Sequence, residues 1–224
     1  MENQDKMLTH AEENYLKVIY HLSQTEDEGI STNAIAQKID TKASSVTDMI
    51  KRLNEKKLII HEKYKGVFIT SEGKHRAKII IRKHRLWEVF LVEKLHFNWD
   101  EVHDLAEELE HIKSEKLINA LDAFLGYPKE DPHGDPIPNA KGEIIFREKE
   151  LLSETEINQE YICVGVKDTS SAFLQYLDRQ KIALGSIFKV LAHENFDHSV
   201  TILFQNSEMT LSKIVAQNLF VKKI

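Results

Sequence analysis

The chain has 224 residues, of which 42% are hydrophobic and 29% charged, with a formal net charge of −6. This balance is ordinary for a globular protein with one large domain or a few small ones. The one cysteine, Cys163, excludes an internal disulfide framework. No apolar run approaches the ~18 residues that cross a bilayer, and the polar start Met1–Asp5 is unlike a secretory signal, so we expect a cytoplasmic protein.

The net charge hides an uneven distribution. Residues 42–86 hold 13 Lys and Arg against 4 Asp and Glu, a balance of +9. Residues 87–136 hold 4 Lys against 13 Asp and Glu, a balance of −9. A basic segment of this size favours contact with a polyanion. A solvated basic face is the alternative that charge alone leaves open.

The first part of the chain has the element order of a winged helix-turn-helix, a DNA-binding motif. Thr9 with Glu12 three residues later forms a capping box, which predicts the start of a helix. Residues 26–29 interrupt this helix. The further predicted elements are helices over Ser31–Ile39 and Ala43–Lys56 and strands over Leu58–Glu62 and Val67–Thr70.

The third predicted helix carries the candidates for reading DNA. Short hydroxyl side chains at a helix start suit phosphates and thymine methyl groups, and Lys and Arg add salt-sensitive attraction to the DNA backbone. Ser44 and Ser45 are equally well explained as helix caps, and Asp48 would repel phosphate. The candidates are Lys42, Ser44, Ser45, Thr47, Lys51 and Arg52.

Three helices, and then short strands with one more short helix, are predicted for the rest of the chain. All four prolines fall within residues 127–142, which indicates a linker or a rigid loop. The predicted elements are helices over Ser71–Leu95, from Asn98 through His111, from Ser114 to Gly126 and near Ser170–Leu177, and strands within 161–166, 187–191 and 200–204 at barrel-like spacing.

Histidines and carboxylates recur at helical spacing in two of these helices. Imidazole and carboxylate groups that converge from two helices suit a divalent transition metal, and the lack of thiolates favours Mn²⁺ or Fe²⁺ over structural zinc. A single such residue is usually a solvated surface residue, but six at this spacing favour a metal site. They are His84 and Glu88, four residues apart, and His103, Glu107, Glu110 and His111, within an arc of ~100° on one helix.

Five segments resemble the DtxR/MntR family of metal-dependent bacterial repressors, and the resemblance covers nearly the whole chain. It implies a homodimer that binds operator DNA at promoters of metal-uptake genes, with Mn²⁺ or Fe²⁺ as co-repressor. The segments are Glu-Asn-Tyr-Leu-Lys-Val-Ile-Tyr at 13–20, Ser-Ser-Val-Thr at 44–47, Arg-Lys-His-Arg-Leu-Trp-Glu at 82–88, Glu-Leu-Glu-His at 108–111 and Asp-Pro-His-Gly-Asp-Pro-Ile-Pro at 131–138.

The resemblance also implies a mainly α fold with a small β part. We expect a winged helix-turn-helix over residues 1–73, a helical metal-binding and dimerisation domain over 74–140, a linker over 141–158, and an SH3-like (FeoA-like) β-barrel domain over 159–224.

Two neighbouring metal sites are implied by the resemblance. His84, Glu88 and His103 match one of them. The second is matched by Glu107, Glu110 and His111 together with a first-helix residue, here Asn14. Iron-responsive members resemble this chain but have cysteine at the position of Glu107, whereas manganese-responsive members have glutamate, so we favour Mn²⁺.

Two positions of the first helix depart from the family pattern. Asn14 stands where relatives have Met or Asp, and its amide oxygen carries no charge. Lys17 stands where manganese-responsive relatives have a glutamate ligand, and a protonated lysine does not bind a metal ion. Asp168 lies in the stretch where some relatives supply Glu and Gln ligands, and it is a weak candidate for a metal ligand. The remaining histidines, His133 among them, have no assigned role.

We therefore expect a metal-controlled repressor and not an enzyme. In this mechanism the metal links the first helix to the metal-bearing helices and sets the spacing of the two DNA-binding heads. One alternative is a metal-independent winged-helix protein, in which the cluster is a salt-bridged helix face. The other is a metal-dependent hydrolase, although no nucleophile motif or glycine-rich phosphate loop supports it.

Overall fold

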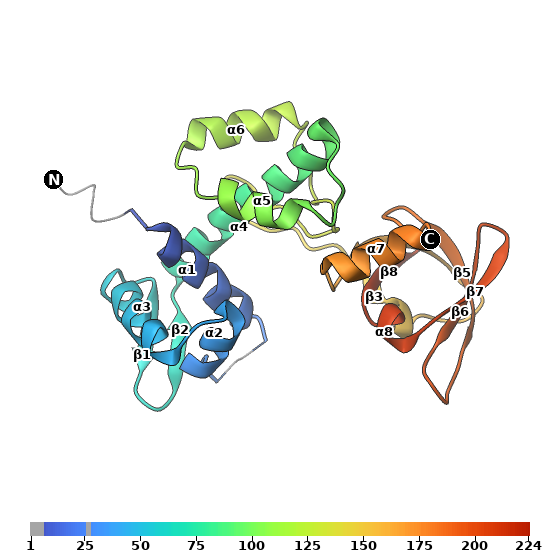
Figure 1. The fold of residues 1–224 in the computed structure, drawn as a ribbon, viewed down its shortest axis with the longest axis horizontal. Helices are drawn as coiled ribbons and strands as arrows, with labels where there is room; N and C mark the ends of the chain where they lie inside the picture. The colour runs from blue at the N-terminus through green and yellow to red at the C-terminus, as the bar shows by residue number, and fades with distance from the viewer. Residues whose placement is uncertain (1–6, 26–27) are drawn as a thin grey trace. The chain divides into compact units, whose positions relative to one another are not determined.

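The computed structural model describes residues 7–25 and 28–224 (Figure 1). The polar N-terminus and residues 26 and 27 of the predicted helix interruption lie outside the described residues. The chain forms two compact units, and the long helix α4 (Ser71–Leu95) contributes to both. The first unit comprises Met1–His84, Glu107–Ala120 and Pro138–Ile144, and the second comprises Arg85–Ala106, Leu121–Ile137 and Ile145–Ile224.

A winged helix-turn-helix occupies the start of the first unit, as predicted. The capping box holds the start of α1, because the Thr9 hydroxyl accepts from the Glu12 amide and the Glu12 carboxylate accepts from the Thr9 amide. Apolar side chains from the three helices and the wing form one core. The elements are α1 (His10–Leu22), α2 (Thr32–Ile39), α3 (Ala43–Glu55) and the antiparallel strands β1 (Ile59–Glu62) and β2 (Gly66–Ile69).

The wing is anchored to the segment before α2. Ile30 and Val67 exchange backbone hydrogen bonds of 2.9 Å in both directions. Gly66 has a φ of +104°, and a Cβ on it would lie 2.6 Å from the carbonyl oxygen of Ile30. Glycine is therefore required where the wing turns back against the core.

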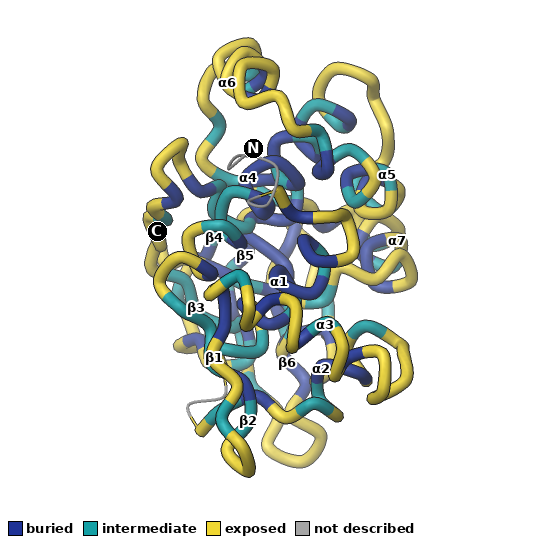
Figure 2. The backbone as a smooth tube through the Cα atoms, turned by 90° about the vertical axis from the view of Figure 1, so that its left-hand side faces the viewer, coloured by how far each residue is buried: buried dark blue, intermediate teal, exposed yellow. Residues whose placement is uncertain are grey.

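Helix α4 has the bounds that its sequence predicts, and two shorter helices follow it: α5 (Val102–Leu109) and α6 (Glu115–Phe124). The prediction of one helix running from Asn98 through His111 is wrong at both ends. Residues 99–101 form a turn, and Glu110 and His111 lie beyond the last turn of α5. Helix α6 is exposed along most of its length, as Figure 2 shows.

The second unit contains an antiparallel six-stranded sheet in the order β3-β8-β4-β5-β6-β7. The predicted strands are confirmed, and their alternating buried residues enclose the core with α7. The elements are β3 (Glu150–Leu151), the short 3-10 helix Leu152–Glu154, β4 (Glu160–Val166), α7 (Ser171–Arg179), β5 (Ile187–His193), β6 (Val200–Phe204), β7 (Ser207–Leu211), α8 (Lys213–Ala216) and β8 (Leu219–Lys223).

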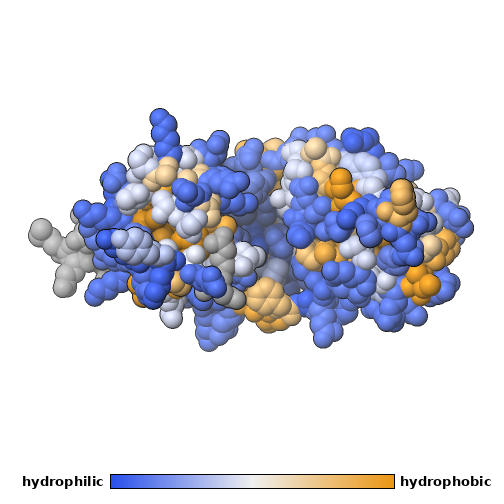
Figure 3. Space-filling model, turned by 90° about the horizontal axis from the view of Figure 1, so that it is seen from below, coloured by the Kyte–Doolittle hydropathy of each residue, from blue (hydrophilic) through white to orange (hydrophobic). Residues whose placement is uncertain are grey.

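Within the described residues, none of the helices combines the length and the apolar character that a membrane span needs. Hydrophilic side chains predominate on the face drawn in Figure 3, with small apolar patches between them.

Candidate metal centre and nucleic-acid interface

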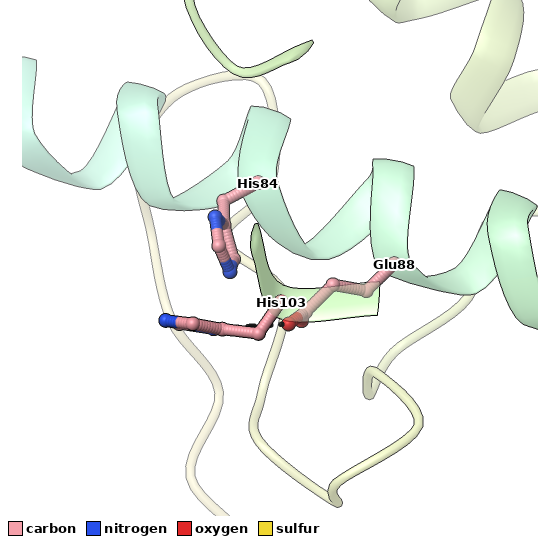
Figure 4. A group of neighbouring side chains, drawn as sticks. All are labelled: His84, Glu88 and His103. Carbon is pink, nitrogen blue, oxygen red and sulfur yellow. Dashed lines mark ion pairs between the residues drawn. The ribbon is translucent and has the colours of Figure 1, made fainter. Parts of the chain in front are cut away.

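Glu88 is the common member of two groups of converging side chains. In the first group, Glu88 meets His84 from the preceding turn of α4 and His103 from the first turn of α5. Their ligand atoms all lie within 4.8 Å of one another. Figure 4 shows both α4 side chains pointing to the same side of the helix, toward the His103 ring. His103 Nδ1 lies 3.5 Å from Glu88 Oε1.

The second group joins Glu88 to Asp131 and His133, and all three residues are buried. His133 Nδ1 lies 3.7 Å from Glu88 Oε1. Its other ring nitrogen, Nε2, lies 2.9 Å from the carbonyl oxygen of Trp99, to which an Nε2–H donates. Nδ1 is therefore the ring nitrogen that lies toward Glu88 and that would bind a metal ion once it has lost its proton.

The segment that carries Asp131 and His133 is held by its own turn and by the sheet. Asp131 Oδ1 accepts from the backbone amides of His133 and Asp135, at 2.8 and 3.0 Å. The carbonyl of His133 accepts from the amide of Val166 in β4 at 2.9 Å. Gly134, with a φ of +83°, packs so closely that a Cβ would lie 2.1 Å from the Val164 carbonyl oxygen. The second unit therefore fixes these two side chains through its backbone.

Negative charge accumulates in this buried group. Burial raises the pKa of Asp131, and the nearby charge of Glu88 raises it further, to about 7, although Arg85 opposes the shift. Arg85 Nε lies 3.3 Å from Asp131 Oδ2. Burial lowers the pKa of His133, but the hydrogen bond and charge of Glu88, together with the charge of Asp131 and the hydrogen bond to Trp99, raise it above its usual value. A divalent cation would relieve the crowding of these carboxylates, so the oxygen and nitrogen donors fit Mn²⁺ or Fe²⁺.

The second predicted metal site has a different arrangement, because a lysine lies inside it. Lys17 Nζ of α1 is 3.0 Å from Glu107 Oε1 and 2.8 and 2.9 Å from the two carboxylate oxygens of Glu110. His111 Nδ1 is hydrogen-bonded to Glu13. Among the described residues, neither converging group of histidines and carboxylates contains Glu107, Glu110 or His111. This donor set does not fit a metal ion while Lys17 occupies it.

Asn14 lies close to this lysine in α1. Its side-chain oxygen is buried and has no hydrogen-bond partner within the described part of the chain. This amide oxygen therefore accepts no hydrogen bond from the described side chains or backbone.

Glu110 connects the lysine to the metal-binding helix. Its Oε2 lies 2.7 Å from His84 Nδ1, and its side chain is fully buried. Burial raises the pKa of Glu110, but the hydrogen bond from His84 and the charge of Lys17 together lower it below its usual value. An Nδ1–H of His84 donates to this carboxylate, so Nε2 is the ring atom suited to bind an ion.

The predicted DNA-contacting residues all lie on the exposed side of α3 or at its start. Lys42 is the N-cap residue and no side chain caps the helix, so the alternative that Ser44 and Ser45 are caps is wrong. The Thr47 hydroxyl donates to the Ala43 carbonyl at 3.0 Å. At the wing tip, Tyr64 is 94% exposed and the ammonium of Lys63 lies 5.0 Å from its ring centroid.

Sequence reasoning found His84, Glu88 and His103 but missed Asp131 and His133 as members of the group. The Asp-Pro-His-Gly-Asp-Pro run at 131–136 was the available signal. An aspartate and a histidine two residues apart, followed by glycine, suit a turn that directs both side chains to one side.

Three family models match the chain. The DNA-binding domain of iron-dependent repressors matches residues 7–67, their metal-binding and dimerisation domain matches 70–139, and the FeoA domain matches 151–223.

Individual relatives agree with these matches. The transcriptional regulator MntR of Oceanobacillus iheyensis is 34% identical over 126 residues, which are 56% of this chain and 84% of the relative. The iron-dependent repressor IdeR of Mycobacterium tuberculosis is 34% identical over 128 residues, which are 56% of this chain and 54% of the relative.

Solved structures are similar over nearly the whole chain. A manganese-dependent transcriptional repressor in complex with manganese has a TM-score of 0.83 and 33% identity, covering 95% of this chain and 100% of that one. The apo form of the manganese-activated repressor ScaR has a TM-score of 0.76 and 35% identity, covering 94% of this chain and 100% of that one.

Proposed function

Because the chain belongs to the DtxR/MntR family of metal-dependent transcriptional repressors, we propose that it is a repressor that binds operator DNA as a homodimer when Mn²⁺ is bound. Fe²⁺ is the second candidate ion. The observation that carries this proposal is the convergence of two groups of ligand atoms on the buried carboxylate of Glu88. The genes of metal uptake are the expected targets, by analogy with the family.

The proposed metal-binding residues come from three segments that are distant in sequence. A bound ion supplies positive charge between carboxylates that otherwise repel each other. Glu88 joins the two groups, His133 is oriented by the Trp99 carbonyl, and His84 is oriented by Glu110. The proposed ligands are His84, Glu88 and His103 in the first group and Glu88, Asp131 and His133 in the second.

Helix α4 connects this centre to the DNA-binding head. It begins at Ser71, separated from the wing strand β2 by one residue, and carries His84 and Glu88 further along. The α3 side chains that we propose to contact the major groove and its phosphates are Lys42, Ser44, Ser45, Thr47, Lys51 and Arg52. In a dimer, a metal ion that holds α4 in one position would set the distance between the two recognition helices. Two operator half-sites can be bound at once only when this distance matches their separation.

A second copy of the chain is the proposed partner of α6. Leu117 and Phe124 of this helix are 43% and 65% exposed, and exposed apolar side chains of this size are typical of protein interfaces. We propose a DNA-binding domain over residues 1–73, a metal-binding and dimerisation domain over 74–140, a linker over 141–158 and an SH3-like domain over 159–224. The end of this linker supplies the edge strand β3 and the buried side chain of Leu152 to the SH3-like domain.

Replacing Glu88 by glutamine tests the proposed function. Glu88→Gln keeps the side-chain shape but removes the shared charge, so we expect Mn²⁺ affinity to fall at least tenfold, ~1.4 kcal/mol or more. The readouts are calorimetric Mn²⁺ titration and binding to a duplex that the Mn²⁺-loaded wild type selects from a random pool, with Mn²⁺ or with chelator.

The matched control is Glu108→Gln, an exposed glutamate of α5. It is expected to behave as the wild type in both assays. Equal Mn²⁺ affinity and equal metal-stimulated DNA binding in Glu88→Gln and the wild type would refute the proposed function.

A further inference from the structure

Lys17 lies where the family resemblance places a second metal ion. It belongs to α1 of the DNA-binding domain, whereas its partners Glu107 and Glu110 lie in and just after α5. All three residues belong to the first compact unit. The distances from Nζ, 3.0 Å to Glu107 and 2.8 and 2.9 Å to Glu110, are those of charge-assisted hydrogen bonds.

Burial makes this cation necessary to the cluster. The Glu110 side chain has no exposed surface, and the Lys17 side chain is 11% exposed. A carboxylate without solvent contact needs a cation or several hydrogen-bond donors, and Glu110 has the ammonium of Lys17 and the imidazole of His84.

His111, another predicted ligand of this site, is also paired with a charged side chain of the chain itself. His111 pairs with Glu13, and its ring stacks on that of His10, with centroids 4.2 Å apart. Glu13 also lies 3.9 Å from the ammonium of Lys83. Each carboxylate of this cluster therefore already has a positively charged or imidazole partner from the chain itself.

We propose that the ammonium of Lys17 replaces the second metal ion in this protein and ties α1 to the α5 end without metal. This inference rests on the proposed function, because it leaves the Glu88 centre as the metal-responsive one. One chain of hydrogen bonds joins His84 of that centre to α1. His84 donates to Glu110, and Glu110 accepts from Lys17.

The first test uses the wild type alone, with hydrogen exchange of the α1 amides measured in chelator and in Mn²⁺. Because Lys17 supplies the link in both conditions, α1 protection is expected to differ less than threefold between them. A tenfold or larger gain of α1 protection on adding Mn²⁺ would overturn the proposal.

The second test counts bound ions by equilibrium dialysis against Mn²⁺. Lys17→Glu replaces the ammonium with a carboxylate beside Glu107, Glu110 and His111, so this variant is expected to bind one more Mn²⁺ per subunit than the wild type. The control Lys56→Glu changes another lysine that pairs with α1, at 2.8 Å from Glu12, and is expected to bind the wild-type number. No gain in Lys17→Glu would contradict the proposal.

The two proposals fail in different ways. The Mn²⁺ affinity of Glu88→Gln tests only whether the Glu88 centre binds the ion. The number of ions bound by Lys17→Glu and the hydrogen exchange of α1 test only whether Lys17 replaces the second ion. If Glu88→Gln binds Mn²⁺ as the wild type does while Lys17→Glu gains one ion, the proposed function fails and the assignment of Lys17 stands.

Discussion

Glu88 and Asp131 are two buried carboxylates of the second unit, and Asp131 is paired with the guanidinium of Arg85. Arg85 Nε reaches Asp131 Oδ2, and its terminal nitrogens bond Asp135 and the carbonyl of Pro136. The guanidinium therefore holds the turn that contains Asp131 and Asp135, and it partly neutralises the charge of Asp131. It does not remove the repulsion that raises the pKa of Asp131.

The raised pKa of Asp131 predicts a pH dependence of metal binding. A metal ligand must be deprotonated, so an ion displaces the proton that Asp131 carries below its pKa of about 7. Between pH 8 and pH 6 the Mn²⁺ affinity is expected to fall, approaching tenfold per pH unit at the acidic end. The raised pKa of His133 adds to the effect in the same direction.

Calorimetric titration across this pH range measures the dependence. In Asp131→Asn the affinity is expected to be lower at pH 8 and to vary less with pH, because one displaced proton is gone. A wild-type affinity that stays constant from pH 8 to pH 6 would count against Asp131 as a ligand.

At the scale of elements, the turn at 131–135 positions the centre through strand β4. The Gly134 backbone fits against Val164 only because it has no side chain, and the His133 carbonyl bonds Val166 of the same strand. Displacement of this turn would move both Asp131 and His133.

Gly134→Ala tests this role of the turn. The added methyl meets the β4 backbone and the residue must keep a positive φ, so we expect a loss of about 1–3 kcal/mol in stability and weaker Mn²⁺ binding. The control is Gly126→Ala, whose φ is +76° but whose Cβ would meet nothing within 4 Å among the described residues.

Thermal unfolding and Mn²⁺ titration of both variants check the prediction. Gly126→Ala is expected to lose about 1 kcal/mol, the backbone cost alone, and to keep its Mn²⁺ affinity. If both variants bind Mn²⁺ equally well, the turn does not position the ligands.

Local sequence signals predict the elements whose ends depend on local interactions. Thr9 and Glu12 set the start of α1, and at the start of α4 the Thr70 hydroxyl accepts a hydrogen bond from the Gly73 amide. The end of α5 was not predictable in this way. Glu110 and His111 leave the helix to pair with Lys17 and Glu13, 93 and 98 residues away in the sequence.

The same reasoning explains which site residues the sequence reveals. His84 and Glu88 are one helical turn apart, so a pattern within one element predicts that they share a face. His133 reaches Glu88 only through the packing of its turn against β4, which no local periodicity encodes. The sequence shows that Lys17 departs from the family pattern, but its partners Glu107 and Glu110 follow only from the tertiary structure.

At the scale of the whole molecule, the uneven distribution of charge agrees with the proposal that one segment binds DNA and the next binds a metal ion. The segment 42–86, with a balance of +9, includes the exposed side of α3 and the wing. The segment 87–136, with a balance of −9, contains four of the five proposed ligands. Positive charge thus lies where DNA phosphates are expected, and negative charge lies where a cation is expected.

The central claim is that Glu88 organises the metal centre and that the Lys17 cluster does not bind an ion. Anomalous scattering at the manganese edge from crystals of the wild type grown with Mn²⁺ tests both parts together. We predict a manganese peak bounded by Glu88 and its partner imidazoles and carboxylates, and no peak between Glu107 and Glu110. A peak between Glu107 and Glu110 with Lys17 displaced, or no peak beside Glu88, would contradict the account.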